Sequence, residues 1–436
     1  MTRLELFVGK GGVGKTTLAC ATAMAYARAG QRVLIASLDQ AHSLGDALGV
    51  RFPHDPGTVT GIARVAPNLD AIEVDSLALL EDRFRDVVRM LATGGRHEHG
   101  IDLAALDPAE LTGLPGVQEL LMLVELAQYA DEDDWDVLVV DCPPSADMLR
   151  LVTAPDTLLG YLERMWPPHA RAMSAGGIDL RRAVLAATVN KIVAAVTEVR
   201  DLLADHARTG ATLVTVAERV AIAETDRVRS AAALLGLRLD AVLVNKVLPA
   251  VPPADSAHPA IDWYLSRRAE QLRVIEQLHS RVDGALPILI AQHSGPEPVG
   301  ITALSALAYA VDSGPALGDP PTGGPTGVTP QQQGVWGDTP TYNLPEVRTS
   351  SGEPVVRWES GTGLHSVYTL RMHLPVVDPA TLRLGRVEDD VIVGADGVRR
   401  RVRLAPVLRR CTVDGAELDG NHLVLRFVPD PELWPR

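Results

Sequence analysis

The sequence predicts an α/β domain with a mostly parallel sheet and helices on both faces, followed by a linker and an all-β sandwich. From residue 4 to about 312, short apolar runs alternate with helical stretches. Residues 313–333 are dominated by Pro, Gly, Thr and Gln, with almost nothing that could be buried. After this segment, apolar residues recur with a period of two. We therefore predict an α/β domain over residues 1–312, a flexible linker over 313–333 and a β-sandwich over 334–436.

The apolar runs of the first domain define its predicted strands, at residues 4–8, 32–38, 70–75, 137–142, 212–217, 241–246 and 286–290. Stretches with helical periodicity lie between them, for example at residues 16–29, 77–91 and 118–130. This alternation of strand and helix is typical of a parallel sheet covered by helices on both faces.

The second domain has the alternation of half-buried strands. One apolar series is Tyr368, Leu370, Met372 and Leu374, with Val367, Thr369, Arg371 and His373 between them. Leu423, Leu425 and Phe427 repeat the pattern. Turn-forming residues at 395–397 and 419–421 separate such runs, which predicts hairpins.

The charge pattern limits the class of partner. The net charge is −14, and residues 1–333 carry 28 basic against 41 acidic side chains, whereas residues 334–436 carry 13 against 14. A strongly acidic domain repels phosphate backbones, so we expect no nucleic-acid partner.

Cysteine and hydropathy patterns indicate a cytoplasmic protein. The three cysteines, Cys20, Cys142 and Cys411, lie far apart with no C-x-x-C pair, so neither a disulfide framework nor a cysteine zinc site is predicted. The first residues run directly into a strand-like segment, so we expect no signal peptide. No uninterrupted apolar stretch reaches the roughly 18 residues of a membrane span, so none is expected.

The strongest motif is a phosphate loop, Gly9-Lys10-Gly11-Gly12-Val13-Gly14-Lys15-Thr16, between a predicted strand and helix. Its glycines let backbone N–H groups close around phosphate oxygens, and the helix adds its positive end. Lys15 is expected to reach the β- and γ-phosphates, and the Thr16 hydroxyl to ligate Mg²⁺. The predicted nucleotide-binding residues are Gly11, Gly12, Val13, Gly14, Lys15, Thr16 and Thr17, with ATP and Mg²⁺ as cofactors. Only four lysines occur in the chain, and two of them, Lys10 and Lys15, are in this loop.

Two acidic residues follow predicted strands. Asp39 ends the second strand, where it could orient the water that attacks the γ-phosphate, or alternatively cap a helix. Asp141 ends the fourth strand in V-V-D-C-P-P, a usual position for the carboxylate beside the magnesium ion, although strand-end aspartates are often structural.

A candidate base contact is Asn245, at the end of the run A-V-L-V-N-K-V-L-P. Its amide could read adenine, and residues 295–300 could close over the base. Asn and Gly at strand ends are also common turn residues, so both interpretations stay open.

Together these residues resemble the ArsA/Get/TRC family of arsenite-pump ATPases and ATPases that guide tail-anchored membrane proteins. The likeness spans roughly residues 1–312 and includes the similar motifs D-Q-A-H-S-L-G-D and D-C-P-P-S-A-D-M-L-R-L. It implies that Lys10 is the extra lysine of a deviant Walker A loop, which reaches across a homodimer to the partner's nucleotide. It also implies that Asp39 positions water, that Asp141 lies beside the magnesium ion and that Asn245 contacts the base.

The sequence departs from the family pattern in several places. Gln40 replaces the usual proline of the first motif, and Asp147 replaces the usual histidine of the second. Without a C-x-x-C pair the zinc-bridged dimer of eukaryotic members is not implied, and the metalloid cysteines of the arsenite pump have no evident counterpart. Residues 334–436 resemble the α-crystallin-like, small heat-shock-type sandwich fused to some bacterial ArsA-like proteins.

We therefore predict an ATP-gated homodimer that binds and releases a hydrophobic protein client. Five of the eight methionines lie in residues 90–173, where they form either a client groove or ordinary core: Met90, Met122, Met148, Met165 and Met173. The alternatives are a metalloid-stimulated ATPase that energises an efflux pump and a partition-type ATPase.

Overall fold

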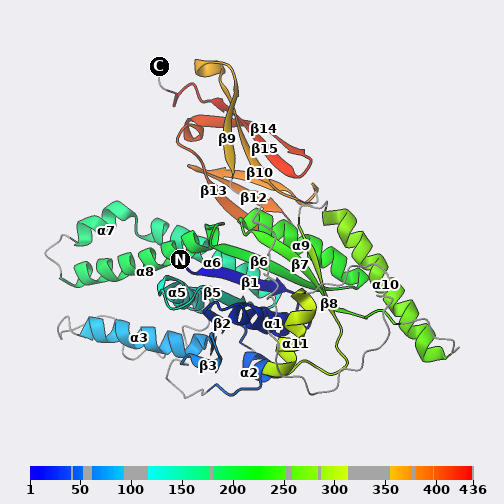
Figure 1. Ribbon diagram of the computed structural model, residues 1–436. Helices are drawn as coiled ribbons and strands as arrows, with labels where there is room; N and C mark the ends of the chain where they lie inside the picture. Colours follow the sequence, from blue (N-terminus) through cyan, green and yellow to red (C-terminus); the bar gives the residue numbers. More distant parts are fainter. Residues whose placement is uncertain are drawn as a thin grey trace.

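The computed structural model describes residues 1–40, 43–52, 61–92, 116–175, 180–251, 258–282, 286–312, 354–375, 377, 379–395 and 397–434. A large sheet with helices on both faces lies below two small antiparallel sheets (Figure 1). The predicted α/β domain followed by an all-β domain is therefore confirmed. The predicted linker, 313–333, and residues 334–353 lie outside the described residues.

The large sheet has eight strands in the order β3-β4-β2-β5-β1-β6-β7-β8. Their bounds are β1 Arg3–Gly9, β2 Val33–Ser37, β3 Ala63–Ala66, β4 Leu69–Glu73, β5 Val137–Asp141, β6 Thr209–Val216, β7 Leu239–Val247 and β8 Ile288–Gln292. All neighbours are parallel except β3 and β4, which are antiparallel. Each of the seven predicted strands overlaps one of these. The edge strand β3 was not predicted.

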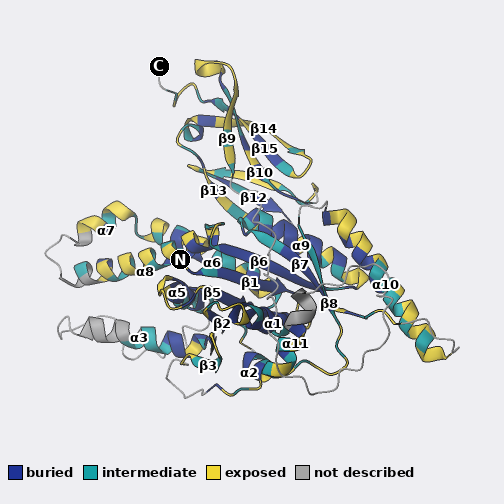
Figure 2. Ribbon diagram, viewed as in Figure 1, coloured by how far each residue is buried: buried dark blue, intermediate teal, exposed yellow. Residues whose placement is uncertain are grey.

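Helices cover both faces of this sheet. One face carries α3 (Ser76–Ala92), α5 (Val117–Asp131), α6 (Ser145–Met165), α8 (Leu180–Ala204), α9 (Arg219–Leu235) and α10 (Pro259–Val282). The short helix α7 (Pro168–Ala175) packs against α8. The other face carries α1 (Lys15–Arg28), α2 (Ser43–Leu48) and α11 (Ile301–Asp312). Figure 2 shows the central strands buried between these layers.

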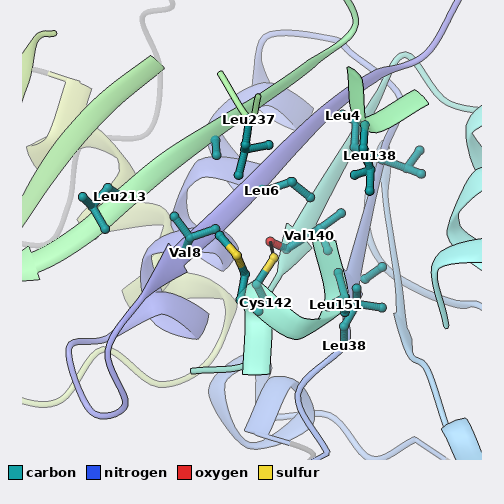
Figure 3. Close-up of a cluster of buried hydrophobic side chains, with 14 of the residues drawn as sticks. Leu4, Leu6, Val8, Leu38, Leu138, Val140, Cys142, Leu151, Leu213 and Leu237 are labelled. Atoms are coloured by element: carbon teal, nitrogen blue, oxygen red, sulfur yellow. Dashed lines mark hydrogen bonds between the residues drawn. The ribbon is translucent and has the colours of Figure 1, made fainter. Parts of the chain in front are cut away.

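The central strand β1 explains why the predicted strands have nearly continuous apolar sequences. Leu4, Leu6 and Val8 point into the core beneath α5, α6 and α9, together with Leu138 and Val140 of β5 (Figure 3). Phe7, between them in sequence, points into the other core, beneath α1. Because side chains alternate between two covered faces, most positions of such a strand are apolar. The buried Glu5 is an exception, and its carboxylate accepts hydrogen bonds from the hydroxyl groups of Tyr26 and Thr212.

The second domain has a four-stranded sheet in the order β14-β15-β10-β9 and a three-stranded sheet in the order β11-β12-β13. Their bounds are β9 Val355–Ser360, β10 Val367–His373, β11 Arg383–Val387, β12 Asp390–Ala395, β13 Val398–Arg403, β14 Cys411–Asp419 and β15 His422–Pro429. Leu370, Met372, Leu425 and Phe427 are buried in their shared core, as the alternation predicts. The predicted turn at 419–421 joins β14 to β15.

The sandwich packs against the α/β domain. Its strands β12 and β13 pack against α9 (Figure 1), and Leu234 of α9 is fully buried within the sandwich core. Among the helices that the structure describes, none is long and apolar enough to cross a bilayer.

Candidate nucleotide site

A cavity of about 760 Å³ lies at the carboxyl edge of the large sheet. This volume is typical of a small-molecule site. The structure brings eight of the predicted site residues to its walls: Gly11, Gly12, Gly14, Lys15, Thr16, Thr17, Asp39 and Asn245. Residues 292–299, which begin at the last residue of β8, form another wall. The cavity therefore collects the ends of β1, β2, β7 and β8.

The phosphate loop turns directly into α1, as its motif predicts. Lys15 is the first residue of the helix, and Gly14 precedes it with φ of 94°, in the left-handed region that favours glycine. A side chain at this position would also overlap the amide of Asn245. Lys15 is buried, and its Nζ donates to the carbonyl oxygen of Lys10 at 3.3 Å. The loop is thus folded tightly, with the positive end of α1 toward the cavity.

Thr16 and Asp141 form the polar base of the site. The Thr16 hydroxyl donates to Asp141 Oδ2 at 2.6 Å and lies 3.1 Å from the Ser43 hydroxyl oxygen. The Ser37 hydroxyl donates to the same carboxylate oxygen at 3.5 Å. Asp141 is completely buried, and its other oxygen, Oδ1, has no hydrogen-bond partner among the described residues.

Burial raises the pKa of Asp141 to about 6, because a carboxylate loses hydration in the core. The hydrogen bond from Thr16 and the positive charge of Lys15 oppose this increase, whereas the negative charge of Asp39 adds to it. A buried carboxylate with one unpartnered oxygen favours a nearby cation.

The donor set fits a magnesium ion that also binds phosphate. Within the described part of the chain, no group of three or more His, Cys, Asp or Glu side chains is placed to hold a metal. Mg²⁺ commonly takes one or two protein oxygens and completes its shell with phosphates and water. Thr16 Oγ1 would supply that oxygen, with Asp141 behind it.

Asp39 lies at the cavity, two residues after the end of β2. Its backbone N–H donates to the Ser37 hydroxyl at 3.3 Å. Helix α2 begins at Ser43, so Asp39 stands too far upstream to be its N-cap. The carboxylate therefore belongs to the cavity wall and not to a helix end.

Asn245 braces the phosphate loop from β7. Its Nδ2 donates to the Val13 carbonyl oxygen at 2.8 Å, and its Oδ1 accepts from the Lys246 backbone N–H at 2.8 Å. Val13 itself is buried behind the loop, and its side chain does not line the cavity. The base contact of Asn245 stays a prediction, since in this arrangement both amide atoms bond to backbone.

Lys10 points out of the site. Its side chain is 61% exposed, and its Nζ lies 3.8 Å from Glu224 Oε2 in α9. The Ser145 hydroxyl, at the start of α6, donates to Glu224 Oε1 at 3.1 Å. The extra lysine of the loop therefore does not reach into the cavity of its own chain.

A family model described as an anion-transporting ATPase, ArsA_ATPase, matches residues 2–311, most of the chain. The chain belongs to the ArsA ATPase family. A second model, described as an HSP20-like domain found in ArsA, matches residues 365–427. Both parts of the predicted resemblance are thus confirmed.

Three relatives of this ArsA-type chain differ in their names and in how much of the chain they match. It is 44% identical over 443 residues to Protein Rv2184c of Mycobacterium tuberculosis, covering 99% of this chain and 97% of that protein. It is 33% identical over 261 residues to a putative arsenical pump-driving ATPase of Prosthecochloris vibrioformis, covering 57% and 62%. It is 30% identical over 264 residues to ATPase GET3 of Candida glabrata, covering 57% and 73%.

The two departures from the family motifs have different surroundings in this ArsA-type domain. Gln40 Nε2 lies 3.3 Å from the Ser76 hydroxyl oxygen of α3 and 3.2 Å from Gln118 Oε1 of α5, so its side chain links the segment after Asp39 to two helices. Asp147 is exposed in the first turn of α6, where it lies 3.5 Å from Arg150.

Sequence reasoning did not name several residues that line the cavity, among them Lys246 and Ser43. Lys246 lines the cavity, and its Nζ donates to the Gly12 carbonyl oxygen at 3.1 Å. Ser43 also lines the cavity and contacts the Thr16 hydroxyl. The rarity of lysine could have identified Lys246, since Lys10, Lys15 and Lys246 account for three of the four lysines. Ser43 stands within the motif that follows Asp39.

Proposed function

We propose that this chain is a magnesium-dependent ATPase whose hydrolysis gates a homodimer that binds and releases a hydrophobic protein client. The convergence of Lys15, Thr16 and Asp39 on one cavity, with Asp141 buried behind Thr16, is the main support. We further propose a cytoplasmic location, where reducing conditions keep thiols free, as Cys20, Cys142 and Cys411 are in the structure.

The chemistry follows from the position of each group. Phosphoryl transfer needs in-line positioning and charge neutralisation more than covalent help. Lys15 and the loop N–H groups would hold the phosphates, and Asp39 would orient the attacking water. A magnesium ion at Thr16 would neutralise phosphate charge. The unpartnered Asp141 Oδ1 would then face a cation, which offsets the cost of its burial.

The exposed position of Lys10 supports the homodimer. Its amine contacts Glu224 outside the cavity, so it is available to another chain. The family resemblance implies that this lysine completes the partner's nucleotide site.

Exposed apolar side chains on α6, α7 and α8 support a hydrophobic client. Tyr161 is 51% exposed, Met165 67% and Met173 78%. Leu185 and Ile192 of α8 are also exposed. Helix α8 packs against both α6 and α7, so these side chains lie in one part of the molecule. An exposed apolar patch can mark an interaction site. Met122 and Met148, by contrast, are buried in the core, so only part of the methionine group could contact a client; the side chain of Met90 lies outside the described set.

The alternative of a metalloid-stimulated pump ATPase has less support, although one relative is named a putative arsenical pump-driving ATPase. All three cysteines are buried, and burial raises the pKa of the Cys142 thiol, so thiolate ligands are disfavoured. A partition-type ATPase would need a basic surface, which the net charge of −14 does not favour.

The first test is ATP hydrolysis by the wild type, Asp39→Asn and Lys10→Ala, with light scattering in ATP and in ADP. Asp39→Asn is expected to bind ATP as a dimer without turnover. Lys10→Ala is expected to lose both turnover and the ATP-dependent dimer. The matched controls are Asp147→Asn and Lys191→Ala, both at exposed positions. Hydrolysis by Asp39→Asn at the wild-type rate would contradict the assignment of Asp39.

A further inference from the structure

Two helices that begin beside the phosphate loop also contact the sandwich. Helix α6 starts at Ser145, whose hydroxyl donates to Glu224 in the second turn of α9 at 3.1 Å. Glu224 also lies 3.8 Å from Lys10 and 4.0 Å from Arg227. The near ends of both helices therefore meet at one carboxylate, which in turn contacts the extra lysine of the loop.

The far end of α9 is held by the sandwich. Leu234 is fully buried among sandwich side chains, and Arg400 Nη1 of β13 donates to the Leu234 carbonyl oxygen at 3.1 Å. The helix is followed by Gly236, with φ of 78°, and a Cβ there would lie 2.8 Å from Arg400 Nη2. Arg400 thus caps a carbonyl at the end of α9 and fills the space that glycine leaves open.

The neighbouring residue of β13 reaches α6. A Cβ at Gly160 would lie 3.4 Å from Arg401 Nη1, so the guanidinium group rests against the helix backbone. Adjacent arginines of one strand therefore touch the two helices whose other ends share Glu224.

Helix α9 connects these two contacts without interruption. Glu224 and Leu234 are ten residues apart, a span of roughly 15 Å in an α-helix. Between them, the buried Asp226 pairs with Arg229 at 3.4 Å and with Arg281 at the end of α10. The buried Asp226–Arg229 pair and the packed core resist bending, so we expect a shift at one end of α9 to reach its other end.

We propose that α9 couples the position of Lys10 to the packing of the sandwich against the α/β domain. The coupling rests on the proposed function, in which Lys10 leaves Glu224 for the partner's nucleotide. The ion pair is exposed and therefore weak enough to exchange. When the Lys10–Glu224 ion pair is lost, one positive charge is removed from the place where α6 and α9 meet. Strand β13 contacts both helices, so its packing against them changes as well. The sandwich thereby takes part in the nucleotide cycle.

Hydrogen exchange of the full chain tests this coupling. The Asp39→Asn variant is compared without nucleotide, with ADP and with ATP, each with Mg²⁺. ATP is expected to slow exchange at residues 11–16 and, in addition, to change exchange at residues 398–403 and in the last turn of α9. Slowed exchange in the loop with no change in β13 or α9 would overturn the coupling and leave ATP binding intact. No change in either region would overturn both.

Two variants with matched controls separate coupling from folding. Glu224→Gln is expected to shift β13 exchange without nucleotide toward its ATP-bound value, whereas Glu276→Gln, at an exposed position of α10, is not. Arg400→Met is expected to keep ATP protection of the loop but lose the ATP-dependent change in β13, whereas the exposed Arg399→Met keeps both. Exchange of β12 and β15 without nucleotide verifies that each sandwich is folded. Wild-type behaviour of both Glu224→Gln and Arg400→Met would refute the coupling.

Discussion

Thr16, in the first turn of α1, donates a hydrogen bond of 2.6 Å to Asp141, the last residue of β5. This contact ties the helix that follows the phosphate loop to the strand beside it. The same hydroxyl oxygen faces the cavity, so one side chain joins the buried carboxylate to the place where phosphate and magnesium would bind.

Thr16→Val keeps the side-chain shape and removes the hydroxyl. We expect ATP turnover to fall on the order of 100-fold or more, the scale of losing one preorganised charge-stabilising group. ATP affinity, measured by calorimetry, should no longer increase when Mg²⁺ is added. Binding of ATP in EDTA, which depends on Lys15 and the loop, serves as the control. An unchanged magnesium dependence would show that Thr16 does not hold the ion.

Asp141→Asn should stabilise the nucleotide-free protein at neutral pH. The folded-state pKa is raised from 3.8 to about 6, so the folded protein binds this proton more tightly than the unfolded chain. The contribution of Asp141 to the free energy of unfolding is therefore greatest below about pH 4 and is lost as pH rises through 6. The variant should exceed the wild type by up to about 3 kcal/mol near pH 7.5, with no difference below about pH 4.

Urea unfolding in EDTA between about pH 4 and 8 measures this difference. Asp147→Asn, at an exposed position, should match the wild type throughout. Lower stability of Asp141→Asn than of the wild type at pH 7.5 would contradict this prediction. It would mean that contacts which asparagine cannot make offset the cost of burying the ionised carboxylate.

Lys246→Met should weaken nucleotide binding. Lys246 bonds to the Gly12 carbonyl oxygen and lines the cavity, so its loss frees the loop and removes a positive charge. One charge-assisted hydrogen bond corresponds to about 1.5–3 kcal/mol, or roughly a tenfold to hundredfold loss of ATP affinity. Lys191→Met, on the exposed surface of α8, is the matched control. Equal ATP affinities for the two variants would exclude Lys246 from the site.

Methionines at exposed and buried positions should respond in opposite ways to substitution by serine. The double variant Met165→Ser and Met173→Ser is expected to lose binding of a fluorescent apolar helical peptide of about 20 residues, with no loss of stability. Met122→Ser, at a buried position, should cost about 2–5 kcal/mol of stability and leave peptide binding by the folded fraction unchanged. Peptide binding by the double variant equal to wild type would place the client elsewhere.

The sequence was sufficient for the parts of the fold that repeat a local pattern. Leu6, Phe7 and Val8 alternate between two cores, which accounts for their apolar run, and Leu370 and Leu425 recur with the period of a half-buried strand. The edge strand β3 was missed because its four residues, Ala63–Ala66, are partly exposed and too short to display either pattern.

Site residues were predictable where a motif fixes their neighbours, as for Lys15 and Thr16. Contacts between distant segments were not. Nothing local indicates that Glu224 meets Lys10, or that Arg400 caps α9, because these pairs are brought together only by packing of whole elements. The same holds for Asn245, whose bond to Val13 depends on the order of β1, β6 and β7 in the sheet.

Because lysine is scarce, reactive amines are unevenly distributed over the surface of the molecule. Of its four lysines, Lys15 is buried, Lys10 and Lys246 are exposed beside the phosphate loop, and Lys191 is exposed on α8. Two of the three lysine side chains accessible to amine-directed acylation therefore lie in or beside the phosphate loop. Immobilising the protein on a sensor through its lysine amines would tether part of it by the site under study, and its buried cysteines offer no simple substitute. An added affinity tag is the attachment that leaves the loop untouched.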